Sequence, residues 1–237
     1  MRVAVGSLAR SPGATTWALA CATVWPTGAA VLAEADGDGG VLAARLGLSL
    51  HPDAPTLVSL LAAGRHAESS SLDLLRHAQT SGGVRVVCGP SGAVAARAAV
   101  SRLADRAEAF GVDAPVDLVL DVGRLRPDSS GCRLAEACDV RVVVVRPELE
   151  ELEPLLAGAD TLGAWGPLMV VVRGSGPYGS GEIGNALADR ATVWSMPEDA
   201  AGVRLLLGQR RGRFDRCALG RAASAWVASI RVGERVV

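Results

Sequence analysis

Short apolar runs alternate along the whole chain with longer segments in which apolar residues recur at helical spacing. The runs are mostly continuous and do not alternate between apolar and polar residues, which is typical of strands that are covered on both faces, as in parallel sheets. They predict strands at residues 2–5, 29–32, 84–88, 116–120, 140–145, 168–172 and 192–195. The pattern therefore predicts a mostly parallel sheet buried between helices.

The segments between these runs predict the helices. Residues 92–109 have apolar positions on one side and charged positions on the other, as expected of an amphipathic surface helix. Helices are predicted at residues 15–24, 56–63, 72–79, 92–109, 148–162, 181–188, 200–207 and 219–230. The alternation of strand and helix, with no linker long enough to divide the chain, predicts one domain over residues 1–237. We expect a doubly wound α/β sheet built from right-handed crossovers, with helices on both faces.

Composition narrows the chemistry that this chain can perform. All 24 residues in the count of lysine plus arginine are arginine, so no lysine can form a Schiff base, act as a base or bind phosphate. The net charge of −1 creates no overall field that attracts nucleic acid or an acidic membrane. No apolar run approaches the ~20 residues of a membrane helix, no basic-then-apolar leader opens the chain, and the cysteines form no CxxC pair. We expect a cytoplasmic protein with reduced thiols and no integral membrane segment.

The first candidate site follows the first predicted strand, at an edge where doubly wound sheets bind ligands. Residues 6–16 read GSLARSPGATT, a loop of small residues that leads into a predicted helix. Such loops bind phosphate through successive backbone N–H groups at the helix N-terminus. Gly13 permits close backbone approach and Thr15 offers a hydroxyl to Mg²⁺, but Ala14 stands where a phosphate loop has its lysine. The alternative is an ordinary strand–turn–helix connection with an N-capping threonine.

Acidic residues follow two further strands. Asp36 lies in residues 34–40, EADGDGG, where alternating acids suit a metal ion or an attacking water; the alternative is a solvated Asp–Gly turn. Asp121 ends an apolar strand that we expect to be central, and an acid there is costly to bury unless it binds a cation, directly or through water. The alternative is a structural aspartate whose hydrogen bonds are satisfied. The two acids and the loop are predicted to meet at one edge of the sheet.

In this order, the three segments resemble the deviant Walker-A ATPases of the MinD/ParA group, including its CpaE/TadZ-type members. The family loop K-G-G-x-G-K-T-T lies over residues 9–16, and the segment D-x-D-P-x-G lies over residues 34–39. The Walker-B segment Y-D-x-x-x-x-D is similar to residues 116–121, which are one residue shorter. The likeness continues through ACDVRVVVVRP at 137–147 and MPED at 196–199, the latter like the family's IPxD turn. The resemblance implies a P-loop NTPase-like, three-layer fold with ATP or ADP and Mg²⁺ as cofactors.

The resemblance also implies roles for individual residues. Asp36 is the counterpart of the family's water-positioning, catalytic acid, while Thr15 and Asp121 correspond to its metal-binding groups. The nucleotide-binding residues that it implies are Arg10, Gly13, Ala14, Thr15, Thr16 and Pro197. Arg10 is included because it is one step from the family's signature lysine.

The departures from the family pattern bear on catalysis. The Walker lysine falls on Ala14, and the signature lysine, which reaches the partner's nucleotide in a dimer, falls on Ala9. Further departures are Arg10 and Ser11 for two glycines, Val172 beside Arg173 for an adenine-reading asparagine, and residues 122–124, VGR, for the prolines after Walker B. The resemblance therefore implies the fold and nucleotide binding, but not efficient hydrolysis.

We therefore predict a degenerate member of the group, a localisation, partitioning or assembly factor, for example of a pilus or secretion system, with weak or absent ATP hydrolysis. A homodimer and a protein partner within a larger assembly are implied. One alternative is a slow ATPase in which Arg10 or a partner's arginine replaces the lysine, since an arginine can carry transition-state charge. Another is a scaffold of the same fold that binds no nucleotide. The densest basic run, Arg210, Arg211, Arg213 and Arg216, indicates either non-specific DNA binding or a solvated loop.

Overall fold

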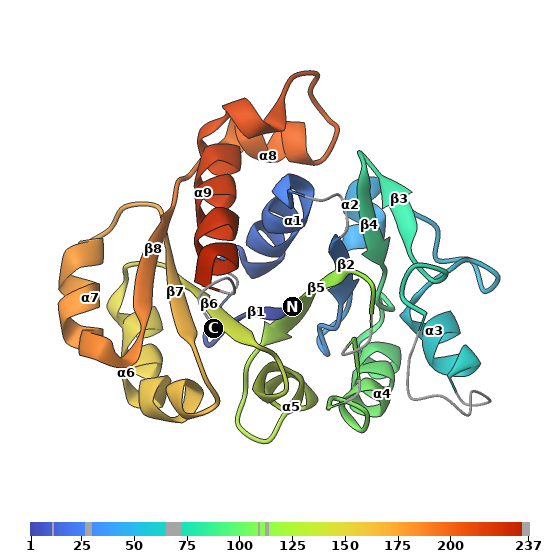
Figure 1. Cartoon of the computed structure of the whole chain (residues 1–237), viewed down its shortest axis with the longest axis horizontal. Helices are drawn as coiled ribbons and strands as arrows, with labels where there is room; N and C mark the ends of the chain where they lie inside the picture. Colours follow the sequence, from blue (N-terminus) through green and yellow to red (C-terminus); the bar gives the residue numbers. More distant parts are fainter. Residues whose placement is uncertain (11, 27–29, 65–72, 109, 112–113, 234–237) are drawn as a thin grey trace.

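An eight-stranded sheet forms the centre of the structure, in the strand order β3-β4-β2-β5-β1-β6-β7-β8 (Figure 1). The structure is a computed structural model, and it describes residues 1–10, 12–26, 30–64, 73–108, 110–111 and 114–233. The strands are β1 (Arg2–Ser7), β2 (Ala30–Glu34), β3 (Gln79–Ser81), β4 (Val84–Val87), β5 (Asp117–Arg124), β6 (Val140–Val145), β7 (Leu168–Arg173) and β8 (Thr192–Met196). All neighbours are parallel except β3, which is antiparallel to β4. The mostly parallel sheet predicted from the apolar runs is confirmed.

Helices cover both faces of this sheet, which gives three layers (Figure 1). One face carries α1 (Ala14–Val24), α2 (Leu42–Leu46), α8 (Ala200–Leu206) and α9 (Ala218–Gly233). The other carries α3 (Leu57–Ala63), α4 (Ala93–Ala104), α5 (Ser130–Glu136), α6 (Leu149–Ala164) and α7 (Ser180–Leu187). Because successive side chains of a strand point to opposite faces, Val3 and Val5 join the first core and Ala4 joins the second. Both faces are therefore apolar, as the continuous runs required.

The helix predicted at residues 72–79 is wrong. Leu72 lies outside the described residues, residues 73–78 form a turn, and Gln79 begins strand β3. Gly82 and Gly83, at φ +56° and +85°, form a two-residue turn that pairs Ser81 with Val84. Two consecutive residues at positive φ are what tight hairpin turns need, and glycine adopts that conformation readily. The Gly-Gly pair was the hairpin signal, and it outweighs the helical spacing before it.

Two short helices were not predicted, and one predicted helix is shorter than expected. Helices α2 and α5 have five and seven residues, too few to establish a helical period in the sequence. Helix α5 begins at a cap that depends on a specific contact, because Ser129 Oγ accepts a hydrogen bond from the Cys132 N–H at 3.2 Å. Helix α4 ends at Ala104 instead of residue 109, which lies outside the described residues.

Helix α1 is buried between the sheet and α9 (Figure 1). Its residues from Trp17 to Ala22 are all buried, and the Trp17 ring meets Trp226 of α9 edge to face, with centroids 6.0 Å apart. Asp117 at the start of β5 ties both helices to the sheet, since it accepts hydrogen bonds from Trp25 Nε1 and Arg231 Nη1. Helix α9, predicted at residues 219–230, thus packs against α1. Within the described part of the chain, no helix is both long enough and apolar enough to cross a membrane.

Candidate functional site

A cavity of about 200 Å³ lies at the N-terminus of α1, where the loop after β1 turns into the helix. Gly13 caps the helix at φ +108°, and its carbonyl accepts a hydrogen bond from the Trp17 N–H at 2.9 Å. Among the described residues, no side chain caps the first turn, so its backbone N–H groups are available to a ligand. Thr15 and Thr16 lie inside the helix, so the alternative of an N-capping threonine is wrong. The lining residues are Ser7, Arg10, Gly13, Ala14, Thr15, Thr16, Asp36, Asp38, Val41, Arg45, Gly123 and Arg124.

The cavity is formed where β1, β2 and β5 end side by side, which places the predicted residues together. The β2–β5 register pairs Glu34 with Asp121, and the β1–β5 register pairs Val5 with Asp121. Strand order therefore brings the loop after β1, the acids after β2 and the acid of β5 to one edge of the sheet. Ser11 of the predicted loop lies outside the described residues.

Glu34 shapes the acidic loop from inside the protein. Its side chain is buried, with Oε1 accepting from the N–H groups of Val41 and Leu42 and Oε2 from that of Gly89. Burial raises the pKa of Glu34, although these three hydrogen bonds partly oppose the shift. We conclude that Glu34 is a structural carboxylate that fixes both ends of residues 35–41, and the sequence did not distinguish this role from that of a ligand.

Asp36 lies on the loop that Glu34 holds, directly above the end of β5. Its Oδ1 accepts a hydrogen bond from the Asp38 N–H at 2.8 Å, so the Asp–Gly turn predicted as an alternative does form. The turn is nevertheless not simply solvated, because burial raises the pKa of Asp36, and the charge of Asp38 adds to this. A Cβ at Gly123 would lie 2.2 Å from Asp36 Cγ, and Gly123 has φ +62°. Glycine at 123 is therefore what lets the acid approach the backbone of β5.

Asp121 is fully buried beneath the same cavity and is only partly satisfied. Its Oδ1 accepts from the Gly123 N–H at 3.3 Å, whereas Oδ2 has no hydrogen-bond partner among the residues described. Burial raises the pKa of Asp121 to about 7, and Glu34 and Asp36 add to the rise, while the Thr15 side chain and the Gly123 N–H oppose it. The Thr15 hydroxyl and the Gly123 N–H are the groups that stabilise the charged form of Asp121. A buried carboxylate oxygen without a partner is costly, so cation binding stays the prediction for Asp121 and a structural role stays its alternative.

Thr15 and Asp121 are suited to a divalent cation, since both offer oxygen. A cage made of protein side chains alone is not present: in the described parts of the chain, no group of three or more His, Cys, Asp or Glu side chains could hold a metal ion. Mg²⁺ commonly keeps several waters and phosphate oxygens as ligands. The site therefore fits Mg²⁺ that arrives with a phosphate chain.

Three arginines line the cavity from which lysine is absent: Arg10, Arg45 and Arg124. Arg10 has φ +38°, and its side chain is 61% exposed, with Nη1 3.9 Å from Glu148 Oε2. Arg45 is exposed on α2, and Arg124 ends strand β5. The sequence singled out Arg10 but missed the other two, although Arg124 stands three positions after Asp121. The place of Arg124 close to Asp121, at the carboxyl end of β5, was the signal that could have found it.

The remaining predicted residue, Pro197, is not among the described residues that line this cavity. It follows β8, one position before Glu198, whose carboxylate lies 3.7 Å from Arg173 Nη2. Arg173 in turn donates from Nη1 to the Pro12 carbonyl at 3.2 Å. Arg173 thereby joins the turn after β8 to the loop that precedes α1, a link that the sequence analysis did not identify.

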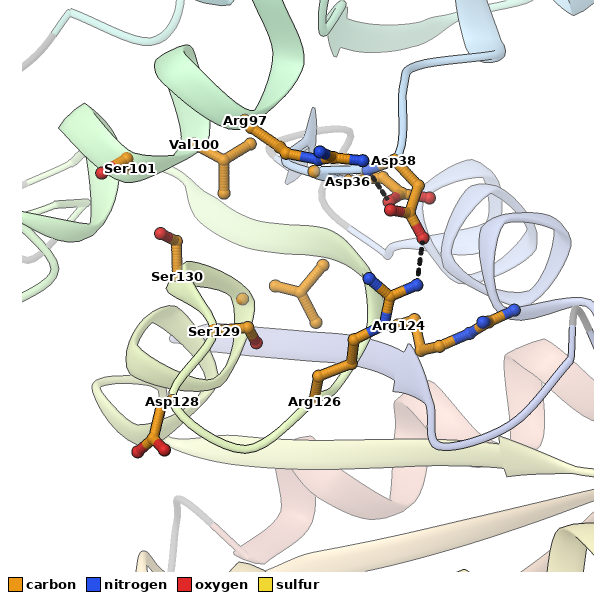
Figure 2. Close-up of a pocket in the computed structure, with 13 residues that line it drawn as sticks. Asp36, Asp38, Arg97, Val100, Ser101, Arg124, Arg126, Asp128, Ser129 and Ser130 are labelled. Carbon is orange, nitrogen blue, oxygen red and sulfur yellow. Dashed lines mark hydrogen bonds and ion pairs between the residues drawn. The ribbon is translucent and has the colours of Figure 1, made fainter. Parts of the chain in front are cut away.

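A second cavity, of about 330 Å³, adjoins the first and shares Asp36, Asp38 and Arg124 with it. Figure 2 shows the acids and Arg97 of α4 on one side, and Ser129 and Ser130 at the start of α5 on the other. Arg126 Nη2 lies 3.1 Å from Asp38 Oδ2, and this ion pair joins the loops that follow β2 and β5. The shared residues therefore form the wall between the two cavities.

The order of strands and helices identifies the fold. A parallel sheet in which the first strand passes through a glycine-containing turn into a buried helix, with acids at the ends of two neighbouring strands, is the fold that P-loop NTPases have. No protein-family model matches the sequence, and no curated protein matches it.

Solved structures with the same fold belong to a smaller group of proteins. The chain is similar to the septum site-determining protein MinD of Pyrococcus horikoshii OT3 complexed with Mg-ADP (TM-score 0.74, 12% identity, 97% of this chain and 95% of that chain covered). It is also similar to a ParA family ATPase from Chlorobium tepidum TLS (TM-score 0.72, 16% identity, 96% and 98% covered). A third is the Cyanothece McdA(D38A)–ATP complex (TM-score 0.66, 14% identity, 100% and 96% covered). The chain has the fold of the ParA and MinD ATPases, as the sequence motifs predicted.

Proposed function

We propose that this protein is a nucleotide-binding factor of the MinD/ParA type that acts in localisation, partitioning or assembly and hydrolyses ATP weakly or not at all. The observation that carries the proposal is the cavity at the N-terminus of α1, which is lined by Gly13, Ala14 and Thr15. The Thr15 side chain in turn interacts with the buried Asp121. Backbone N–H groups and the helix terminus favour an anion there. The buried, half-paired Asp121 favours a cation beside it.

The absence of the lysine is expected to weaken nucleotide binding but to affect ATP hydrolysis more. The first-turn N–H groups still provide donors to phosphate, but the mobile charge on the outer phosphates is missing at Ala14. Removing a charge partner from a buried site costs about 3–5 kcal/mol. We therefore propose that ATP or ADP binds weakly with Mg²⁺, and that Asp36 has the position of the water-positioning acid without the charge that efficient hydrolysis needs.

Titration with ATP and ADP in the presence of Mg²⁺, followed by a phosphate-release assay, tests this proposal. We expect nucleotide binding at or above micromolar concentration, a loss of its Mg²⁺ dependence in Asp121→Asn, and turnover near the background rate. Turnover that disappears in Arg10→Ala would instead favour the slow ATPase. If neither nucleotide raises the melting temperature at millimolar concentration, the protein is a scaffold of the same fold and our proposal is wrong.

The exposed arginines of the protein indicate the kind of partner that it binds. Arg210, Arg211, Arg213 and Arg216 are all exposed between α8 and the start of α9. Within the part of the chain that the structure describes, Arg213 is the member of this cluster that forms an ion pair, with Asp215. A loop that presents unneutralised guanidinium groups binds phosphate without sequence preference. We propose non-specific DNA as its partner, alongside a homodimer formed over the nucleotide face and a protein partner in a larger assembly such as a pilus or secretion system.

DNA binding is tested by fluorescence anisotropy over a range of salt concentrations. Replacing Arg210, Arg211 and Arg216 by glutamine is expected to weaken binding and to reduce the slope of log affinity against log salt by about 2–3, one unit per lost phosphate contact. The matched control makes the same change at Arg97, Arg102 and Arg106, which removes equal charge near α4. Equal losses in both triple variants would show that only net charge matters, and the arginine-rich loop would not be the DNA surface.

A further inference from the structure

Because the lysine is absent, another cationic side chain must face the phosphate groups of a bound nucleotide. The three arginines that line the cavity differ in how deeply they are buried. Arg10 extends outward, since its side chain is 61% exposed and lies beside Glu148. Arg45 is an exposed residue of the short helix α2. Arg124 is partly buried, and its Nε is buried without a hydrogen-bond partner among the residues that the structure describes. A buried guanidinium N–H without a partner is costly unless an acceptor occupies the site.

Arg124 is also held more firmly than the other two. It is the last residue of β5, where the register pairs it with Ser7 of β1. The following residue, Leu125, donates its N–H to the Ser7 carbonyl at 2.8 Å, which continues the ladder past Arg124. The side chain then crosses to the loop before α1, where Nη2 donates to the Arg10 carbonyl at 3.2 Å. Arg124 is therefore positioned by the central strands and linked directly to the loop that would surround phosphate.

Two other arginines near the site each have an acidic partner. Arg126 forms an ion pair with Asp38, and Figure 2 shows it reaching Asp38 while the neighbouring Arg124 takes a different direction from the end of β5. Arg173 donates to the Pro12 carbonyl and lies beside Glu198. Neither of these two lines the cavity at the start of α1, whereas Arg124 lines both this cavity and its neighbour.

We infer that Arg124 supplies the positive charge that the phosphate chain of the ligand requires, in place of the lysine absent at Ala14. This inference rests on the nucleotide binding proposed above and names the residue responsible for it. A guanidinium can donate to one carbonyl from one nitrogen and still present further N–H groups to an anion in a fixed plane. With Nη2 on the Arg10 carbonyl, Nε and the remaining donors are left for phosphate oxygens. Arg10, which the sequence favoured, is then a rim residue.

The inference is tested by calorimetric titration of wild type, Arg124→Gln, Arg124→Lys and Arg10→Gln with ATP, pyrophosphate and adenosine. Glutamine removes the charge and keeps one N–H₂ donor, near the position that Nε has in arginine. We expect Arg124→Gln to bind ATP and pyrophosphate about 10- to 100-fold more weakly, the range of a charge-assisted hydrogen bond, with adenosine unchanged. Arg124→Lys should recover part of the loss, and Arg10→Gln should lose less than Arg124→Gln. Arg126→Gln, which alters a neighbouring arginine paired with Asp38, is the matched control and should bind like wild type.

The other outcomes contradict different claims. If wild type binds ATP and Arg124→Gln binds equally well, or if Arg10→Gln loses more, nucleotide binding stands and the role of Arg124 is refuted. A loss in Arg124→Gln that affects adenosine as strongly as ATP, without recovery in Arg124→Lys, would make Arg124 a structural residue. If wild type binds neither ATP nor pyrophosphate, the proposed function itself fails, and the role of Arg124 fails with it.

Discussion

Replacing Asp121 by asparagine is expected to stabilise the ligand-free protein at about pH 8, by as much as about 4 kcal/mol. Asp121 is fully buried, Oδ2 has no partner among the described residues, and burial raises its pKa to about 7. An unfolded aspartate has a pKa of about 3.9, and a shift of one pKa unit corresponds to about 1.4 kcal/mol. The shift in pKa from about 3.9 to about 7 therefore corresponds to about 4 kcal/mol of folding stability, which the protein loses when Asp121 is ionised.

The sign of the pH dependence follows from proton binding. Between the unfolded and folded pKa values, the folded state holds a proton on Asp121 that the unfolded state has released. The free energy of unfolding should therefore fall as pH rises from about 4 to about 7, and Glu34 and Asp36, whose pKa values are also raised, change it in the same direction. Asparagine cannot ionise, so most of this slope should disappear in Asp121→Asn.

Urea denaturation in EDTA at several pH values between about 5 and 8 measures this effect. Asp38→Asn is the matched control, because it changes a partly exposed acid of the same site and should leave most of the slope in place. A variant Asp121→Asn that is less stable than wild type at about pH 8 would show that the carboxylate is satisfied after all. The stability gained in Asp121→Asn should be accompanied by lost Mg²⁺-dependent nucleotide binding, as expected where a destabilising charge serves function.

The second large effect is expected at Trp226, which holds α9 against α1. Its side chain is fully buried, and its ring packs on Trp17 with centroids 6.0 Å apart and planes at 67°. Trp226→Ala should cost about 3–5 kcal/mol, because it removes a large buried ring and leaves a cavity. Trp17 also donates its backbone N–H to the Gly13 carbonyl, so a loosened α1 should weaken phosphate binding at the helix N-terminus as well.

Urea denaturation of Trp226→Ala and Trp226→Phe measures this contribution. Neither Trp226 Nε1 nor Trp17 Nε1 has a hydrogen-bond partner within the described residues, so phenylalanine removes an unpaired buried N–H along with part of the ring. Leaving such a group unpaired costs about 1–3 kcal/mol, which offsets the lost area, so Trp226→Phe should be nearly as stable as wild type. Both variants lack the indole N–H group. If they lose stability equally, the loss comes from this group, and our prediction that the packed ring stabilises the protein is wrong.

The apolar runs predicted most of the fold because a strand buried on both faces leaves a local signal. All seven predicted strands are present, and β6 has the predicted bounds, residues 140–145. The wrong helix at residues 72–79 and the missed helices α2 and α5 have a common cause. Their structure is set by particular contacts, such as the Gly82–Gly83 turn and the Ser129 cap, and not by a period that extends over many residues.

The candidate site was predictable only as a set of positions. Gly13, Thr15, Asp36 and Asp121 could be placed at one edge because they follow strands of a parallel sheet, and the structure does bring them together. The sequence did not separate Glu34 from Asp36, since both acids follow the same predicted strand, residues 29–32. Only the packed structure shows Glu34 accepting three backbone hydrogen bonds while Asp36 faces the cavities.

The sequence alone determined that the sheet is parallel and covered on both faces, because strands buried in this way leave continuous apolar runs. It also determined that no site contains lysine, because the chain has none. The tertiary structure decided which charges act together. It left Asp121 half-paired beneath the cavity, turned Arg10 toward Glu148, and placed Arg124 against the loop before α1. These outcomes depend on strand order and register, which bring together residues more than a hundred positions apart, and a linear pattern does not encode such distances.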